Sequence, residues 1–373
     1  MAIVRATGDT GESFAEGTSR SVTSTLTDRM VTVEGGHREM GRQLGEQCRD
    51  RIARVLDFLR GELPSRDVQA RVEAYLPFVM RQAPLLIEEL DGLAEGARIR
   101  SWEALLIQVR FELIGYDNVA LEGCTSFAIR ADDRIITGQN VDTTSELADM
   151  GIVLRMRPFD GPEKLMYTYF PGMLGYLGIN SAGLTCFGNA VVSPGWKPGF
   201  PRYFVLRGVL ESETVDEAQA AVKAINRASS INVVLTDRRG TIRDLEIDVE
   251  RIGVLHDTNG WIGHANHYLS PELREKDLLL RVAPDSGVRQ RVIDDRLAQI
   301  QAEGHADIER MKDVLRDHEG YPQSVCRHPV PHGITDLERS QTVASLVTDS
   351  EAGRMHVAFG PPCCTEYVTF SFN

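Results

Sequence analysis

The sequence predicts an α+β protein in which β-sheets are layered with helices. Apolar residues recur at helical spacing through the first third of the chain. From residue 123 onward, short strand-like runs separated by polar turns replace that pattern. A second group of such runs closes the chain, and helical segments lie between the two groups. Two β blocks with helices between and around them favour sheets packed against helices.

The N-terminal region divides into a tail and a helical segment. Residues 1–29 are rich in Ser, Thr, Gly and charge, and we expect a flexible tail there. Residues 30–123 are interpreted as a mostly helical segment that opens with a short strand at 31–34. Within it, the spacing of apolar positions predicts helices at residues 36–61, 67–81, 84–97 and 102–115.

Residues 124–373 are expected to form the core of the fold. The turn at residues 180–183, Asn-Ser-Ala-Gly, is a hairpin signal between two strands. Helices are predicted at 214–226, 288–302 and 308–315. Strands are predicted at 124–130, 135–140, 151–156, 164–170, 176–180, 183–189, 232–236, 242–247, 342–348, 355–359 and 367–372.

The net charge of the chain limits the kinds of molecule that it is expected to bind. The 373 residues carry a formal net charge of −13, which argues against nucleic acid and anionic membrane, because both reward clustered cations. The first residues contain Arg5, Asp9 and Glu12 where a signal peptide needs an apolar stretch. We therefore expect a soluble, cytoplasmic enzyme or small-molecule binder.

The six cysteines do not predict a disulfide scaffold or a zinc site. None forms a C-x-x-C pair in this long chain. Cys326, His328 and His332 resemble a ligand set, but Pro329 and Pro331 break any regular ligand face. His264 and His267 are three residues apart without a matching third ligand. No metal is therefore expected.

The Gly123-Cys124 junction is the most informative stretch. Glycine leaves its carbonyl unshielded and permits backbone angles that other residues avoid, so a strained bond can sit there. A thiolate attacking that carbonyl gives a thioester, and water then cuts the chain. Cys124 becomes an N-terminus whose α-amine titrates near ~7.7–8 and can accept the thiol proton. The alternative is a small apolar residue that starts a strand.

Three polar residues are candidates to assist such a cysteine. Asp142 closes a strand 18 residues further on (142 − 124), which suits a hairpin that returns beside the first strand. Its carboxylate could hold the α-ammonium of Cys124. Asn189 and Asn266 offer amide N–H groups suited to an oxyanion, although asparagine is also a frequent turn former.

These motifs resemble the penicillin acyltransferase-like N-terminal-nucleophile hydrolases, the group that includes acyl-CoA:6-aminopenicillanate (isopenicillin N) acyltransferase. The Gly-Cys junction and its Asn-x-Asp partner are the most specific part, and the resemblance runs from about residue 35 to the end. The motifs that carry it are Gly123-Cys124-Thr125-Ser126, Gly138-Gln139-Asn140-x-Asp142, the Gly-x-Asn-x-x-Gly-Leu hairpin ending at Asn189, Asn266-His267-Tyr268, residues 324–328, and residues 342–346 with Gly360-Pro361.

The resemblance implies a four-layered αββα fold and autocatalytic cleavage before the cysteine. It makes Cys124 the nucleophile, Asp142 the group that orients its amine, and Asn266 the main oxyanion donor. It places Asn189 at another polar site position and Ser126 where the acyltransferase has a threonine. It also makes Arg339 the candidate late arginine of the site. The two products, 1–123 and 124–373, would stay associated, because neither alone buries its half of the core.

The sequence therefore predicts a self-processing cysteine amidohydrolase that acts on a non-peptide amide of a small molecule. No metal or organic cofactor is required for these steps. Acyl transfer to an amine, with acyl-CoA as a donor, uses the same residues, and a non-catalytic ligand-binding scaffold is the alternative of another class. Substrate, homo-oligomer formation and pathway stay open. Four aromatics are candidates either to hold an apolar acyl group or to belong to the core: Phe170, Tyr176, Phe187 and Trp196.

Overall fold

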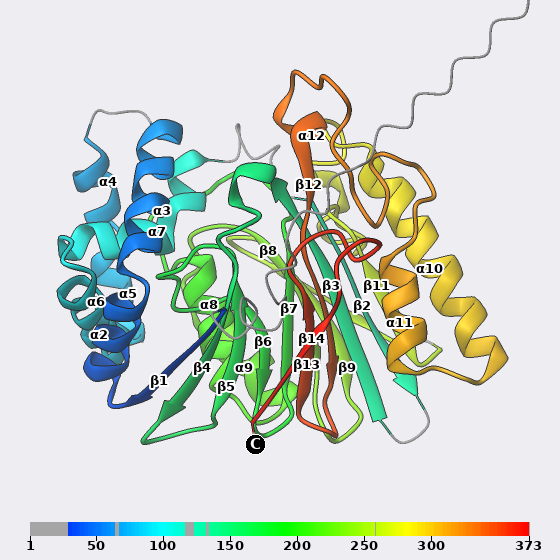
Figure 1. The fold of residues 1–373 in the computed structure, drawn as a ribbon, viewed down its shortest axis with the longest axis horizontal. Helices are drawn as coiled ribbons and strands as arrows, with labels where there is room; N and C mark the ends of the chain where they lie inside the picture. Colours follow the sequence, from blue (N-terminus) through cyan, green and yellow to red (C-terminus); the bar gives the residue numbers. More distant parts are fainter. Residues whose placement is uncertain (1–28, 64–66, 116–122, 132–133, 258, 373) are drawn as a thin grey trace, which may run out of the picture.

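The computed structural model describes residues 29–63, 67–115, 123–131, 134–257 and 259–372. The tail expected at 1–29 therefore lies almost wholly outside the described residues. Two β-sheets lie face to face, with helices on the outer side of each. Figure 1 shows a helical group at one end of the molecule, in blue and cyan, and a helix pair in yellow and orange at the other.

The larger sheet has eight strands in the order β1-β4-β5-β6-β7-β8-β9-β10. The pairing of β1 with β4 is parallel, and each of the other neighbours pairs antiparallel. The hairpin predicted around residues 180–183 is confirmed by the pairing of β6 with β7. The strands are β1 (Met30–Gly35), β4 (Ile152–Pro158), β5 (Lys164–Thr168), β6 (Leu177–Asn180), β7 (Thr185–Asn189), β8 (Ile231–Thr236), β9 (Ile242–Ile247) and β10 (Ile252–His256).

The smaller sheet has six strands in the order β11-β2-β3-β12-β13-β14 and is antiparallel throughout. Its central hairpin, β2 with β3, brings residues near 124 and 142 side by side, as the spacing predicted. The strands are β2 (Gly123–Ala131), β3 (Arg134–Thr144), β11 (Trp261–His264), β12 (Ser340–Asp349), β13 (Arg354–Ala358) and β14 (Val368–Ser371).

Helices cover both outer faces and complete four layers. On the larger sheet lie α8 (Arg202–Leu210) and α9 (Val215–Ala224), and on the smaller sheet lie α10 (Asp285–Glu303) and α11 (Ile308–Leu315). The four-layered αββα arrangement is thus confirmed. None of the helices in the described part of the chain combines the length and apolar character that a bilayer span requires.

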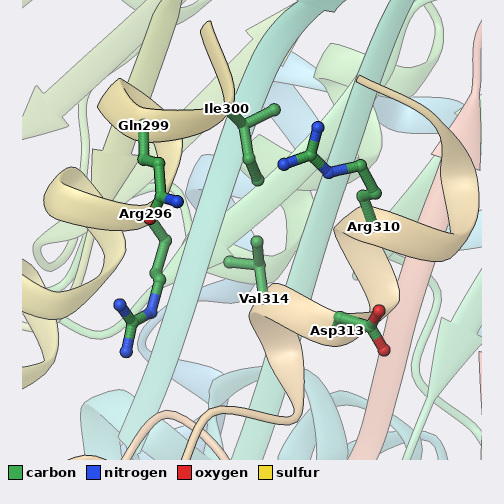
Figure 2. Close-up of a pocket in the computed structure, with 6 residues that line it drawn as sticks. All are labelled: Arg296, Gln299, Ile300, Arg310, Asp313 and Val314. Carbon is green, nitrogen blue, oxygen red and sulfur yellow. The ribbon is translucent and has the colours of Figure 1, made fainter. Parts of the chain in front are cut away.

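The gap between α10 and α11 forms a small pocket of about 290 Å³. In Figure 2 an isoleucine and a valine face this gap, while polar side chains flank it from both helices. The apolar pair continues the core between these helices and the smaller sheet. The pocket is lined by Arg296, Gln299, Ile300, Arg310, Asp313 and Val314.

The N-terminal helices pack unusually closely where glycines face backbone. A Cβ on Gly41 or Gly45 of one helix would overlap backbone atoms of the partner, and so would one on Gly92 or Gly96. The side-chain-free surfaces let the two helices approach each other. The pair is α2 (His37–Gln47) with α6 (Pro84–Ala97), and the group also contains α3 (Arg49–Glu62), α4 (Val68–Glu73), α5 (Leu76–Gln82) and α7 (Ser101–Ile114).

The space between the sheets contains polar contacts as well as apolar core. Thr185 Oγ1 lies 2.7 Å from Thr236 Oγ1, and Thr137 Oγ1 lies 3.1 Å from the same hydroxyl. Gln139 Nε2 donates to Gly188 O at 2.8 Å. The hydrogen bonds of Thr137 and Gln139 join β3 to the larger sheet, so they fix how the strands that carry the candidate site face each other.

Candidate active site

The Gly123–Cys124 junction forms the start of β2. Gly123 lies opposite Asp142 in the antiparallel ladder, and Cys124 lies opposite Val141. The Cys124 side chain is 2% exposed. Hairpin pairing therefore places the predicted nucleophile and the predicted carboxylate at the same end of the smaller sheet.

Gly123 could take backbone angles that other residues avoid, but the structure shows a paired strand residue there. Gly123 is a strand residue and is absent from the positive-φ glycines. Its missing side chain matters for a different reason, because a Cβ there would lie 3.0 Å from Asp142 Oδ2 and 3.2 Å from Arg327 Nη2. The glycine thus lets a buried carboxylate and a buried guanidinium approach the junction.

The backbone of Cys124 is held on both sides. Its N–H donates to Asn266 Oδ1 at 2.8 Å. Its carbonyl oxygen accepts from Arg289 Nη1 at 2.6 Å, and Arg289 Nη2 donates to the same Asn266 oxygen at 2.8 Å. A single asparagine oxygen therefore joins the Cys124 amide to Arg289.

The amide of Asn266 is oriented by further bonds. Its Nδ2 donates to Ala190 O at 2.9 Å, and its backbone N–H donates to Ser286 Oγ at 2.8 Å. The oxygen of Asn266, not its nitrogen, thus faces the Cys124 N–H. Nδ2 carries two hydrogens, so an oxyanion could still use the one that Ala190 does not take.

Asp142 is fully buried between a hydroxyl and a guanidinium. Thr342 Oγ1 donates to its Oδ1 at 2.7 Å, and Arg327 Nε donates to its Oδ2 at 3.2 Å. Burial raises the pKa of Asp142, and Arg327 and Arg289 oppose this shift. Both arginines also bind Asp285.

Asp142, Asp285, Arg289 and Arg327 form what we call the junction cluster. It pairs two buried carboxylates with two buried guanidiniums beside the Gly123–Cys124 peptide. Although burial alone raises the pKa of Asp285, Arg289 and Arg327 hold it below the usual value. The cluster can therefore keep opposite charges next to the junction in an interior that would otherwise reject them.

Ser126 and Asn189 form a second polar contact at this end of the sheets. Ser126 Oγ donates to Asn189 Oδ1 at 2.6 Å, and Asn189 Nδ2 donates to His264 O at 3.0 Å. All three residues are fully buried. The contact links β2, β7 and β11 two residues from Cys124, so both residues hold the two sheets together near the junction.

The structure does not place Arg339 in the junction cluster. Arg339 is exposed at the end of the short helix α12 (Asp336–Arg339), and its Nη2 donates to Ile334 O at 3.1 Å. The neighbouring Ser340 accepts from Arg327 Nη1 at 3.2 Å. Among the described residues, the arginines beside the junction are instead Arg289 and Arg327.

Sequence reasoning missed Asp285, Arg289 and Arg327. Asp285 and Arg289 are four residues apart on α10, a spacing that puts both on one face of a helix. That spacing is common on exposed helices and gave no sign of burial. Arg327 lies within the segment 324–328 that carried the family resemblance, but its side chain had no assigned role.

The four candidate substrate aromatics belong mainly to the protein interior. Phe170, Tyr176 and Phe187 are at most 4% exposed and are part of the main core. Trp196 is partly buried, packs 5.5 Å from the ring of Phe111, and donates from Nε1 to a serine hydroxyl. These rings therefore contribute to packing.

Comparisons with known proteins identify relatives over most of the chain. Residues 129–363 match the family model described as acyl-coenzyme A:6-aminopenicillanic acid acyl-transferase. The chain is 28% identical over 343 residues to the acyl-coenzyme A:6-aminopenicillanic-acid-acyltransferase 40 kDa form of Emericella nidulans, covering 89% of this chain and 92% of that protein.

Solved structures give weaker similarities. A mutant of the conjugated bile acid hydrolase from Clostridium perfringens aligns with a TM-score of 0.47 and 14% identity, covering 67% of this chain and 97% of that one. Penicillin V acylase from Agrobacterium tumefaciens aligns with a TM-score of 0.46 and 15% identity, covering 67% and 86%.

The family model covers more than half of the 373 residues. It begins five residues after Cys124 and includes Asp142, Asn189 and Asn266. The chain therefore belongs to the acyl-coenzyme A:6-aminopenicillanic acid acyl-transferase family of enzymes.

Proposed function

We propose that this enzyme cuts its own chain before Cys124 and then uses the new N-terminal cysteine to hydrolyse a non-peptide amide of a small molecule. The observation that carries the proposal is the position of the Gly123–Cys124 peptide. It lies beside the junction cluster, with the Cys124 N–H 2.8 Å from Asn266 Oδ1.

Self-cleavage would begin with attack of the Cys124 sulfur on the Gly123 carbonyl. The C–N bond breaks, the nitrogen takes a proton, and a Gly123 thioester forms on the sulfur. Water then cleaves the thioester to give a Gly123 carboxylate and a free Cys124 thiol. The fixed bonds from Asn266 and Arg289 to the Cys124 backbone support this step, because a held peptide needs less ordering at the moment of reaction.

Turnover would use the same sulfur with its own α-amine as base. The amine accepts the thiol proton, the sulfur attacks the substrate carbonyl, and the amine returns the proton to the departing nitrogen. Asn266 Oδ1 already accepts from the nitrogen that becomes this amine. Asp142, opposite Gly123 in the ladder, adds a carboxylate near the same group. Water then releases the acyl group from the thioester.

The two products, residues 1–123 and 124–373, would remain together. β1 pairs with β4 in the larger sheet, so the first chain contributes a strand to the second. Glu112 of α7 accepts from the Arg202 N–H at 2.8 Å and from Ser229 Oγ at 2.9 Å. Separation would expose this interface, which favours a stable two-chain protein.

Acyl transfer to an amine is the second candidate. The family model and the Emericella nidulans relative both carry the name of an enzyme that uses an acyl-coenzyme A. The same thioester would serve, with an amine in place of water. Hydrolysis needs only the groups near Cys124, whereas a coenzyme A site also requires cations for its phosphates.

The decisive experiment is an intact-mass measurement of purified wild-type protein and of Cys124→Ala. We expect wild type to give two masses, one for a chain that ends at Gly123 and one for a chain that begins at Cys124. The variant should give the mass of a single chain. Cys186→Ala is the matched control, because Cys186 is an equally buried strand cysteine outside the junction. An active wild-type preparation in one unbroken chain would overturn the proposal.

A second assay separates hydrolysis from transfer. A panel of acyl amides is incubated with the two-chain protein, with and without coenzyme A or an acceptor amine. Release of free acid without any acceptor supports hydrolysis. Product that forms only when the acceptor is present would establish transfer instead.

A further inference from the structure

Two histidines and two cysteines converge on one point outside the candidate active site. Their ligand atoms all lie within 4.8 Å of one another. Three of the side chains come from the segment after α11 and one from the connection between β13 and β14. We call them the His–Cys group, and its members are His318, Cys326, His328 and Cys363.

Three of the six distances between the ligand atoms, those that end at His328 Nε2, fit a tetrahedron around zinc. His318 Nε2 lies 3.1 Å from His328 Nε2, and the sulfurs of Cys326 and Cys363 lie 3.6 and 3.5 Å from the same nitrogen. Zinc bonds of ~2.0–2.1 Å to nitrogen and ~2.3 Å to sulfur require tetrahedral edges of about 3.3 Å between nitrogens and about 3.5–3.6 Å between nitrogen and sulfur. Every measured edge lies within about 0.2 Å of these values.

Hydrogen bonding does not explain the arrangement. His328 Nε2 is approached at once by a nitrogen and two sulfurs. A ring nitrogen has either one hydrogen or one lone pair in its plane, so it can satisfy one of these three neighbours. A cation at the centre satisfies all four atoms together.

The backbone holds these side chains in place. The Cys326 N–H donates to Asp317 O at 2.9 Å, and the His328 N–H donates to Pro322 O at 2.9 Å. Arg316 Nε donates to Pro362 O at 3.0 Å, which fixes the segment before Cys363. The group is therefore preorganised by bonds that do not involve its ligand atoms.

We propose that the His–Cys group binds one structural zinc ion. Four protein ligands close the coordination shell, as structural sites require, and a mixed N₂S₂ set is typical of zinc. Two thiols would release their protons on binding, and two thiolates with two neutral imidazoles then balance the charge of Zn²⁺. Cys326 is buried while His318 and Cys363 are exposed, so the metal can enter from solvent.

The proposed zinc would also restrict the position of Arg327, a member of the junction cluster. Arg327 lies between the ligands Cys326 and His328, and its guanidinium binds Asp142 and Asp285. Fixing the backbone on both sides of Arg327 restricts the position of that guanidinium. This consequence rests on the proposed function, whereas the zinc site itself does not.

From the sequence we considered a different set of ligands and rejected it, because two prolines interrupt that segment. Of the three residues weighed there, Cys326 and His328 belong to the group, but His332 is exposed in a turn with a φ of 61°. His318 and Cys363 replace it, and Cys363 is 35 residues from His328. Ligands from separate loops need no regular spacing, so the two prolines were no obstacle.

The test is metal analysis of the full chain, loaded with zinc alone and then freed of excess metal. We expect one zinc per chain in wild type and loss of that zinc in Cys363→Ser. Cys364→Ser is the matched control, because Cys364 is the adjacent exposed cysteine outside the group and should leave the zinc in place. Neither chain cleavage nor activity is a readout, so this test is independent of the proposed function.

A spectroscopic measurement covers the case in which Cys363→Ser does not fold. Cobalt in place of zinc should give wild type the intense visible bands of tetrahedral Co²⁺ and a thiolate charge-transfer band, and His318→Ala should weaken them. A wild-type protein that binds neither metal would overturn the proposal. So would a disulfide between Cys326 and Cys363 in mass spectra of the unreduced wild-type protein, or equal zinc retention by Cys363→Ser.

Discussion

Two clusters of opposite charges, one buried and the other buried except for Glu211, lie in different surroundings. The junction cluster joins two carboxylates to two arginines beside the Gly123–Cys124 peptide. A second group, which we call the helix-layer cluster, joins two carboxylates to two cations under the N-terminal helices. Its members are Glu89, Lys164, Arg207 and Glu211.

The difference lies in what each cluster touches. In the helix-layer cluster, Arg207 of α8 binds Glu89 of α6 at 2.9 Å and Glu211 at 2.6 Å, so it ties helices together. In the junction cluster, Arg289 binds the carbonyl of Cys124, and Arg327 lies 3.2 Å from where a Gly123 Cβ would be. Burial of ion pairs alone therefore does not mark a reactive site, whereas contact with a particular peptide does.

The largest effect is expected from Arg327→Met. The change leaves Asp142 with Thr342 as its remaining hydrogen-bond donor and Asp285 with Arg289 as its remaining ion-pair partner. We expect chain cleavage to slow by about 100-fold or more, because small displacements of reacting groups cost that much. The fraction of cleaved chain is followed by mass spectrometry over time. Wild-type cleavage in folded Arg327→Met would show that the cluster does not act on the junction.

Arg207→Met should break the helix-layer cluster without touching cleavage. Burial raises the pKa of Glu89, but Arg207 and His37 hold it below the usual value. The change would leave this buried carboxylate with His37 as its remaining ion-pair partner. We expect a loss of about 3–5 kcal/mol in the free energy of unfolding, measured in urea. Folded Arg207→Met should still be cut at the wild-type rate. Slowed cleavage would mean that the two clusters are coupled.

The pH dependence of the free energy of unfolding should reveal a third buried ionic contact, between His264 and Glu246. A histidine changes charge in an accessible pH range, whereas an arginine does not. Burial alone lowers the pKa of His264, but Asp244 and Glu246 outweigh it and raise the pKa from 6.5 to about 9. Because the folded pKa is the higher one, this stabilisation is complete below pH 6.5 and is lost as pH rises through 9. The loss is about 3 kcal/mol.

Urea unfolding at pH 6.5 and pH 9 measures this change. Burial raises the pKa of Asp244 to about 7, so its own loss of stability runs from acid pH up through about 7 and adds to the change measured above pH 6.5. His305→Gln is the control, because His305 is exposed and should leave the slope unaltered. Stability that stays level from pH 6.5 to 9 would show that His264 is not held as a charged partner of Glu246.

Most elements were predictable where one face is polar and the other apolar. The helix predicted at 84–97 coincides with α6, and the β2–β3 hairpin follows from its strand pattern and spacing. The helix α8 was missed because its residues are buried nearly all round, which removes the helical period. The breaks at Cys48 and between α4 and α5 were missed because apolar spacing continues across them.

The candidate site could be predicted only where its residues lie on neighbouring strands of one hairpin. Cys124 and Asp142 lie on one hairpin, so a count of residues brings them together. Arg289 and Arg327 reach the junction from a helix and a loop more than 160 residues away. No local pattern separates them from the other arginines, since burial rather than spacing makes them partners of a carboxylate.

The smallest effects are expected from replacing two threonines, each of which should lower the free energy of unfolding by a small amount. Thr342 Oγ1 donates to Asp142 Oδ1 at 2.7 Å and accepts from the Arg327 N–H at 2.9 Å. Thr342→Val removes both bonds, which should lower the free energy of unfolding by about 1–3 kcal/mol and slow chain cleavage several-fold.

Thr214→Ala provides the matched comparison for that change. Thr214 Oγ1 caps α9 by accepting from the Glu217 N–H at 3.3 Å, and its loss should cost about 1 kcal/mol. Cleavage should be unaltered, since this cap does not contact the junction cluster. If both variants lose stability and only Thr342→Val is cut slowly, the effect follows the position of Asp142. Equal cleavage in both would mean that the carboxylate keeps its place through Arg327 alone.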